Sequence, residues 1–173
     1  MKSAVLFLLM ALIALGGVLV TGGDAGADAA RKLPAFEMRD LQEREHRLTD
    51  ERFKGKRVVV AAFGTWQQVS IDQARELEKF HKAHPEVEII AFVVDTLPAA
   101  RDFVAMHELT FPCYKADTSS RIGTTFNRLF KTRKGKTLVL DRIPFVLLAD
   151  ADRNVDFAAL GVVTADALAA ELR

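Results

Sequence analysis

The sequence predicts an α/β protein with a central mixed β-sheet flanked by helices. Two runs, 58–63, which is apolar throughout, and 87–94, which is apolar except at Glu88, are rich in β-branched residues and are typical of strands buried on both faces of a sheet. Each run is followed by a segment with apolar residues at helical spacing. Near the end of the chain, two further apolar runs enclose a polar turn at 150–154, which predicts an antiparallel hairpin within the same sheet.

Composition is consistent with one domain that has a proper hydrophobic core. The chain has 173 residues, of which 50% are hydrophobic. Lys and Arg number 24 against 23 Asp and Glu, so the net charge of +1 creates no global field that would attract nucleic acid. We therefore expect no nucleic-acid partner.

The N-terminus has the composition of an export signal. Lys2 precedes an apolar stretch that runs to Val20, and the small residues Ala25-Gly26-Ala27 follow. Cleavage would fall after Ala27 or after Ala29. An uncleaved anchor is the alternative, because an apolar stretch of about 17 residues is at the lower limit for spanning a bilayer. We expect residues 1–27 to be a signal peptide or membrane anchor, residues 31–173 to be the folded domain, and the protein to reside in the periplasm or cell envelope of a bacterium.

The remaining elements follow from apolar spacing and capping residues. Helices are expected where apolar residues recur every three or four positions, and the first of them should end at His84-Pro85, because the residue before proline disfavours the helical conformation. Thr164 is a good N-cap for the last helix. The expected helices cover 71–83, 98–109, 118–130 and 164–172, and the expected short strands cover 111–114, 137–140, 145–149 and 155–160.

Five short motifs follow one another along the chain: Leu33-Pro34-Ala35-Phe36, Leu48-Thr49-Asp50 with 53–56, Phe63-Gly64-Thr65-Trp66, Phe111-Pro112, and Ile143-Pro144 with 145–150. In this order they resemble the exported thioredoxin-like proteins of the TlpA and redoxin type, which are thiol-disulfide oxidoreductases. The resemblance implies a thioredoxin-like fold with an opening N-terminal strand extension at 33–36. It also implies that Pro144 is a cis-proline, and that residues 131–141 are an insertion before the strand that follows this proline.

The redox cysteine pair of that family is missing. The places of the family's C-x-x-C are occupied by Gln67, Gln68, Val69 and Ser70. Dithiol exchange needs a thiolate that attacks a disulfide sulfur, and neither an amide nor a serine hydroxyl can replace it. Ser70 could be a catalytic nucleophile, but no base is close to it in sequence, and Ser70 with Gln73 matches an S-x-x-Q capping box. We expect no dithiol-disulfide activity and no catalytic residue at these positions.

The resemblance also implies a peptide-binding surface that does not depend on the missing thiols. In the family, the backbone before the cis-proline pairs with an extended segment of a partner protein, a form of β-augmentation. We therefore expect an envelope protein or peptide as the partner, and a function that is accessory or chaperone-like. The residues expected to form this surface are Trp66, Gln67, Gln68, Ser70, Ile143 and Pro144.

Cys113 is the only cysteine, so no intramolecular disulfide can form. It lies in an apolar segment and is expected to be a small buried hydrophobe. The alternative is a redoxin-type oxidoreductase that uses this single thiol.

Two other clusters have ordinary structural explanations. His81 and His84 lie near a helix end, where the helix dipole favours cations, so we expect neither a metal site nor a cofactor. A basic cluster precedes Pro144 and consists of Arg128, Lys131, Arg133, Lys134 and Lys136. It is interpreted either as an edge hairpin with protective lysines or as a surface for an anionic partner or lipid headgroups.

Overall fold

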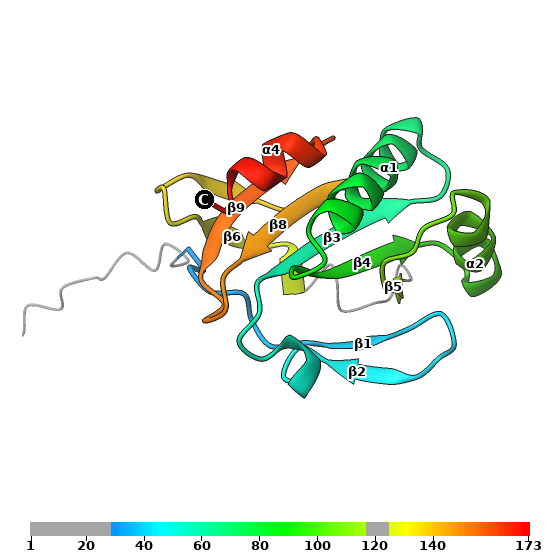
Figure 1. Ribbon diagram of the computed structural model, residues 1–173, viewed down its shortest axis with the longest axis horizontal. Helices are drawn as coiled ribbons and strands as arrows, with labels where there is room; N and C mark the ends of the chain where they lie inside the picture. The colour runs from blue at the N-terminus through cyan, green and yellow to red at the C-terminus, as the bar shows by residue number, and fades with distance from the viewer. Residues whose placement is uncertain (1–28, 117–124) are drawn as a thin grey trace, which may run out of the picture.

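A five-stranded mixed sheet forms the centre of the protein in the computed structural model, which describes residues 29–116 and 125–173 (Figure 1). The strand order is β5-β4-β3-β8-β9, with β3, β4 and β5 parallel and β8 and β9 antiparallel to their neighbours. The strands are β3 (Val58–Gly64), β4 (Glu88–Val94), β5 (Cys113–Ala116), β8 (Phe145–Ala149) and β9 (Val155–Leu160). This arrangement confirms the predicted fold class.

Three helices in the described part of the chain pack on the same face of the sheet (Figure 1). They are α1 (Gln68–Ala83), α2 (Leu97–Met106) and α4 (Ala165–Ala170). The predicted end of α1 and the predicted N-cap of α4 are both confirmed. Helix α1 stops one residue before His84-Pro85, and the Ala167 amide donates a hydrogen bond of 3.2 Å to the N-cap hydroxyl of Thr164.

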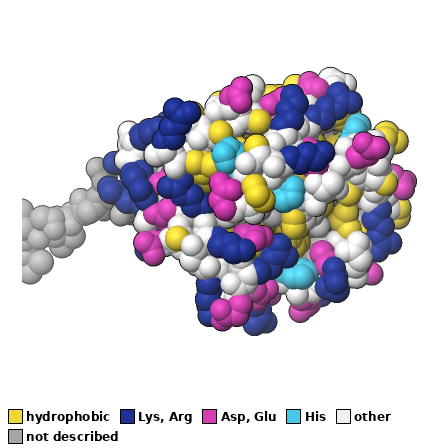
Figure 2. Space-filling model, viewed as in Figure 1, with side chains coloured by type: hydrophobic (Ala, Val, Ile, Leu, Met, Phe, Trp, Pro, Cys, Tyr) yellow, Lys and Arg dark blue, Asp and Glu magenta, His cyan; other side chains and the backbone are white. Residues whose placement is uncertain are grey.

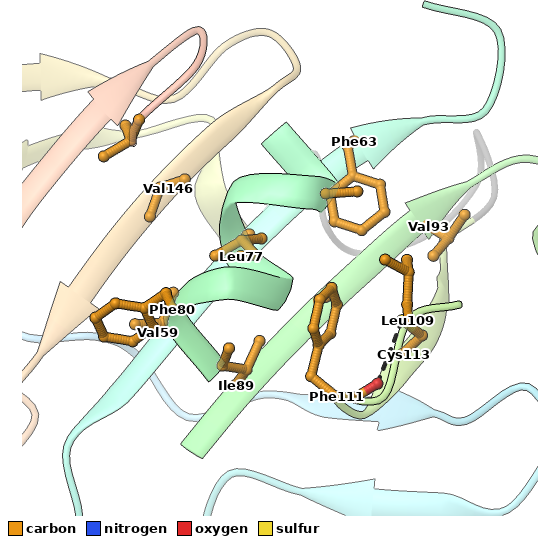
Figure 3. Packing of buried hydrophobic residues seen from close by; sticks show 14 of the residues in the cluster. Val59, Phe63, Leu77, Phe80, Ile89, Val93, Leu109, Phe111, Cys113 and Val146 are labelled. Atoms are coloured by element: carbon orange, nitrogen blue, oxygen red, sulfur yellow. Dashed lines mark hydrogen bonds between the residues drawn. The ribbon is translucent and has the colours of Figure 1, made fainter. Parts of the chain in front are cut away.

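Side chains of β3 alternate between two hydrophobic clusters, as the two-residue period of a strand requires. Val59, Ala61 and Phe63 point toward the helices and join Leu77 and Phe80 of α1 (Figure 3). The even-numbered residues of the strand point to the opposite cluster, which covers the other face of the sheet. All seven residues of β3 are buried, so the end of this strand is a rigid base for the loop that follows it.

A short hairpin and a 3-10 turn cover the second face. Strand β1 (Glu37–Arg39) pairs with β2 (Glu45–Arg47), and η1 (Glu51–Phe53) follows. The expectation of an opening strand at 33–36 was wrong by several residues. Leu33 makes a single backbone contact with Arg153 at 2.8 Å, and Pro34 has no N–H to donate to a ladder.

The predicted helix at 118–130 was wrong at its end. Residues 117–124 lie outside the described part of the chain, but Leu129–Lys131 form strand β6, which pairs with β7 (Thr137–Val139) in a separate hairpin. Phe130 is fully buried in the second cluster. Phe126 lies at the end of a helical turn and shares the second cluster with Phe130, so the predicted helix ends before β6 begins. The β6–β7 hairpin contains most of the predicted insertion.

The predicted leader, residues 1–27, lies outside the described residues. Within 29–116 and 125–173 there is no helix whose length and apolarity would allow it to cross a membrane.

Candidate functional site

The loop that joins β3 to α1 is braced by a short chain of hydrogen bonds. We call residues 64–70 the site turn. The Gly64 amide donates to Ser70 Oγ at 3.1 Å, and the Ser70 hydroxyl in turn donates to Gln67 Oε1 at 3.2 Å. The predicted capping box was wrong: Gln67 is the N-cap of α1, and Ser70 lies within the first turn. Ser70 is fully buried, so it supports the turn from inside rather than presenting a hydroxyl to a partner.

Gln73, the other half of the predicted capping box, links two separate elements. Its side chain accepts a hydrogen bond from the Val163 amide at 2.7 Å and donates to the Val163 carbonyl at 3.3 Å. Gln73 is fully buried, and these bonds satisfy its amide. Its role is to attach α1 to the segment that leads into α4.

Trp66 lies over Gly64 and next to Ile143. A Cβ atom added at Gly64 would be 3.0 Å from one ring carbon of Trp66 and 3.1 Å from Ile143 Cδ1. Only glycine allows this close approach, because any side chain at position 64 would push the indole or the isoleucine away. The indole is nevertheless 61% exposed. The sequence motif contained Gly64, but the motif alone did not indicate that the residue makes room for Trp66.

The segment before β8 reaches the same place from the other side. The Ile143–Pro144 peptide bond is cis, and the Gly161 amide donates to the Pro144 carbonyl at 2.8 Å. Pro144 itself is buried, whereas Ile143 is partly exposed beside Trp66. Pro144 thus positions the backbone, and Ile143 supplies the accessible apolar side chain.

Thr65 and Asp95 connect the ends of the parallel strands β3 and β4. The Thr65 hydroxyl donates to the Asp95 carboxylate, which also accepts a hydrogen bond from the Thr96 amide at 2.6 Å. These hydrogen bonds lower the pKa of Asp95 below its ordinary value. Asp95 is therefore a carboxylate at neutral pH and fixes the base of the site turn. Sequence reasoning missed this pair, because its members lie thirty positions apart.

The accessible part of the site is mainly apolar. Val69 is 49% exposed on the first turn of α1, and Gln67 is partly exposed. Gln68 is exposed, but its side-chain amide donates to Asp72 at 2.9 Å and so follows the helix surface. We define the Trp66 surface as Trp66, Gln67, Val69 and Ile143. Val69 was not among the predicted binding residues, although its apolar side chain at the start of an exposed helical turn was a usable signal.

Cys113 is confirmed as a buried residue. It lies at the start of β5, opposite Ala91 of β4, and its thiol donates a hydrogen bond of 3.6 Å to the Phe111 carbonyl (Figure 3). Burial, together with the negative charge of Glu78, raises the pKa of this thiol to about 12. A thiol with that pKa is almost entirely protonated at neutral pH and is a poor nucleophile.

The histidines have neighbours that explain their positions. Among residues 29–116 and 125–173, no group of three or more His, Cys, Asp or Glu side chains could hold a metal ion. Nδ1 of His84 lies 3.1 Å from Oε1 of Glu86, and the His81 ring packs edge-on against the Phe111 ring.

Two members of the basic cluster form ion pairs within the protein. Arg133 pairs with Asp150 and, at 3.0 Å, with Asp156, while Lys134 pairs with Glu171 at 2.6 Å. These ion pairs attach the β6–β7 hairpin to the β8–β9 turn, to β9 and to the C-terminal residues.

Together, the sheet order, the cis-proline beside the turn and the position of α1 define a thioredoxin-like protein without the dithiol. A family model described as the AhpC/TSA family matches residues 29–171. The chain belongs to this family, and the predicted thioredoxin-like relationship is confirmed. A search of curated proteins finds no match.

Several solved structures share the fold. StoA from Bacillus subtilis is 15% identical with a TM-score of 0.63, and the match covers 83% of this chain and 99% of that one. A secreted Mycobacterium tuberculosis disulfide oxidoreductase homologous to E. coli DsbE is 16% identical with a TM-score of 0.64, and the match covers 79% of this chain and 93% of that one. A DsbF homologue from Corynebacterium diphtheriae is 19% identical with a TM-score of 0.67, covering 87% and 88%. At these identities the likeness establishes the fold alone.

Proposed function

We propose that this protein is a redox-inactive, thioredoxin-like cell-envelope protein that binds an extended segment of a partner protein on the Trp66 surface. The proposal is carried by one contrast at the site turn, between the scaffold that is retained and the cysteines that are missing. The turn, the glycine that makes room for Trp66 and the cis-proline are all present, but the two positions that would hold the reactive sulfurs are an amide and an alcohol.

The chemistry of these two positions supports a binding role. Gln67 has no ionisable group, and the Ser70 hydroxyl is fully buried and hydrogen-bonded within the turn. A serine nucleophile needs a base within hydrogen-bond reach, but the partners of Ser70 are the Gly64 amide and the Gln67 side chain. Neither partner can accept a proton at neutral pH, so the hydroxyl stays unactivated.

The accessible groups suit an extended peptide. Trp66 offers a broad apolar face with one N–H donor, a combination that is enriched in protein interfaces. In the loops of the described residues, no backbone hydrogen bond uses the amide or the carbonyl of Ile143. A peptide strand could therefore pair with this backbone while its side chains contact Trp66 and Val69.

The alternative, an oxidoreductase that uses Cys113, receives no support from the geometry. Cys113 is only 8% exposed, and its raised pKa leaves little thiolate to react. It also lies on edge strand β5, whereas the Trp66 surface is at the end of the central strand β3.

Peptide binding can be measured with a library of short fluorescent peptides and fluorescence polarisation. Trp66→Ala and Ile143→Ala are expected to weaken binding at least tenfold, since a few apolar side chains that become buried at the centre of an interface dominate its energy. Met106→Ala is the matched control, because Met106 is an equally apolar side chain, 75% exposed, at the far end of α2. If both site variants bind peptides as tightly as the Met106 control, the Trp66 surface is not the binding site.

A further inference from the structure

Cations gather where the described chain begins. Backbone hydrogen bonds hold this first segment between two elements: the Ala30 amide donates to the Leu129 carbonyl at 2.7 Å, and the Val155 amide donates to the Arg31 carbonyl at 2.9 Å. We define the entry patch as Arg31, Lys32, Lys131 and Arg133. Figure 2 shows Lys and Arg side chains clustered on this end of the molecule, next to the grey segment.

The entry patch surrounds a hollow rather than a flat surface. Arg31, Lys131 and Arg133 line a pocket of about 220 Å³ together with Thr132, Asn154 and Val155. The lining supplies guanidinium, ammonium and hydroxyl donors, which suit phosphate oxygens.

The patch has uncompensated positive charge. Asp150 and Asp156 are nearby, but their side chains are only 16% and 11% exposed, and both pair with Arg133. In the described part of the chain, Arg31, Lys32 and Lys131 belong to no ion pair. The carboxylates therefore hold Arg133 in place, while three other cations face outward.

The entry patch and the Trp66 surface lie at opposite ends of the sheet. Strand β8 begins directly after Pro144 and ends at Ala149, and the turn that follows contains Asn154 of the pocket. Five strand residues span about 17 Å. Figure 1 shows the same separation, because the chain enters at the end of the sheet away from the β3–α1 loop.

Proximity to a membrane depends on the uncleaved anchor, which the sequence allows beside cleavage after Ala27 or Ala29. With the anchor retained, the length of the preceding chain limits how far the patch can be from the membrane. The apolar stretch ends at Val20, and the eight residues 21–28 reach at most about 28 Å when fully extended. We propose that the entry patch binds anionic phospholipid headgroups at the membrane surface, so that the Trp66 surface points away from the bilayer. A tether of this length raises the effective concentration of the patch at the membrane, in addition to the affinity that the four cations provide by themselves.

The domain at 29–173 is suitable for the experiment, because every buried residue of the two hydrophobic clusters lies between Leu33 and Leu168. Its binding to phosphatidylglycerol vesicles and to neutral phosphatidylcholine vesicles is measured by co-sedimentation at low and high salt. We expect binding to the anionic vesicles only, weakening as salt increases. Equal binding to both vesicle types, or none to anionic vesicles at low salt, would overturn the proposal.

Charge removal locates the contact. The triple variant Arg31→Gln, Lys32→Gln, Lys131→Gln is expected to lose about fivefold in affinity per cation. The matched control removes three cations of α1, Arg75→Gln, Lys79→Gln and Lys82→Gln, and should bind nearly as the unaltered domain does. Circular dichroism establishes that both variants fold. An equal loss in both variants would show that the charge effect is not local and would contradict the proposal.

Two further readouts test the orientation and the ligand. Trp66 is the only tryptophan, so its fluorescence reports its own surroundings. Vesicle-bound protein should keep its emission maximum and its quenching by acrylamide; a blue shift with protection would place Trp66 in the bilayer and refute the orientation.

Inorganic phosphate at constant ionic strength should not displace the domain from vesicles. Displacement would mean that the pocket takes free phosphate instead of a lipid headgroup.

Discussion

The reactivity of Cys113 can be predicted quantitatively from its surroundings. Burial and Glu78 raise its thiol pKa from 9.0 to about 12, so the thiolate fraction at neutral pH falls by about three powers of ten. Alkylation proceeds through the thiolate. The folded protein should therefore react with iodoacetamide about a thousandfold more slowly than the same chain unfolded in urea.

The measurement is simple because the chain has one cysteine. Mass spectrometry of samples taken over time gives the rate for the folded and the unfolded chain at the same pH. Cys113→Ser is the blank for alkylation at other side chains. A folded-state rate within tenfold of the unfolded rate would refute the reasoning from burial and would revive the single-thiol oxidoreductase.

Two further predictions concern hydrogen bonds that shape the domain. Ser70→Ala removes the acceptor of the buried Gly64 amide, so chemical denaturation should show a loss of about 1 to 3 kcal/mol in the free energy of unfolding; a loss below about 0.5 kcal/mol would contradict the bracing role. Asp40 is desolvated, which opposes ionisation, but hydrogen bonds from His46, Arg44 and Gln42 prevail and lower its pKa from 3.8 to about 2. Because the folded-state pKa is the lower one, this stabilisation, about 2 kcal/mol, is complete above pH 4 and disappears as the pH falls through 2. The stability difference between the wild type and Asp40→Asn should follow that course in denaturation experiments, and a difference that is independent of pH would contradict it.

The sequence predicted most of the central sheet because local patterns and burial agree there. The run at 58–63 is apolar at every position, and a strand buried on both faces requires that pattern. Proline after His84 and the Thr164 cap fixed two helix boundaries, since both act through the local backbone.

The errors occurred where distant segments determine the local structure. Phe130 has the spacing of a helical residue, but its backbone belongs to a ladder with β7 and bridges to Ala30. No local pattern contains that information. Ser70 and Gln73 matched a capping motif only by spacing, because their actual partners are Gly64 and Val163. Burial of a polar side chain against a remote element cannot be inferred from its immediate neighbours.

Local motifs named the residues of the candidate site but could not indicate how they lie in space. The motif around Trp66 and the proline at 144 carried the resemblance, and the structure brings Trp66 and Ile143 together over Gly64. Which of these side chains are accessible could not be predicted: Ser70 and Pro144 are buried, whereas Val69 is exposed.

Restoration of the missing thiols tests most directly whether this scaffold lacks only its chemistry. Gln67 and Ser70 stand at the N-cap and in the first turn of α1, where the helix dipole favours a thiolate. We expect the wild type to leave the reduction of insulin by dithiothreitol at its background rate, and the double variant Gln67→Cys, Ser70→Cys to accelerate it at least tenfold. Acceleration by the wild type, or a correctly folded double variant that remains inactive, would show that the scaffold does not differ from its relatives only in the missing thiols.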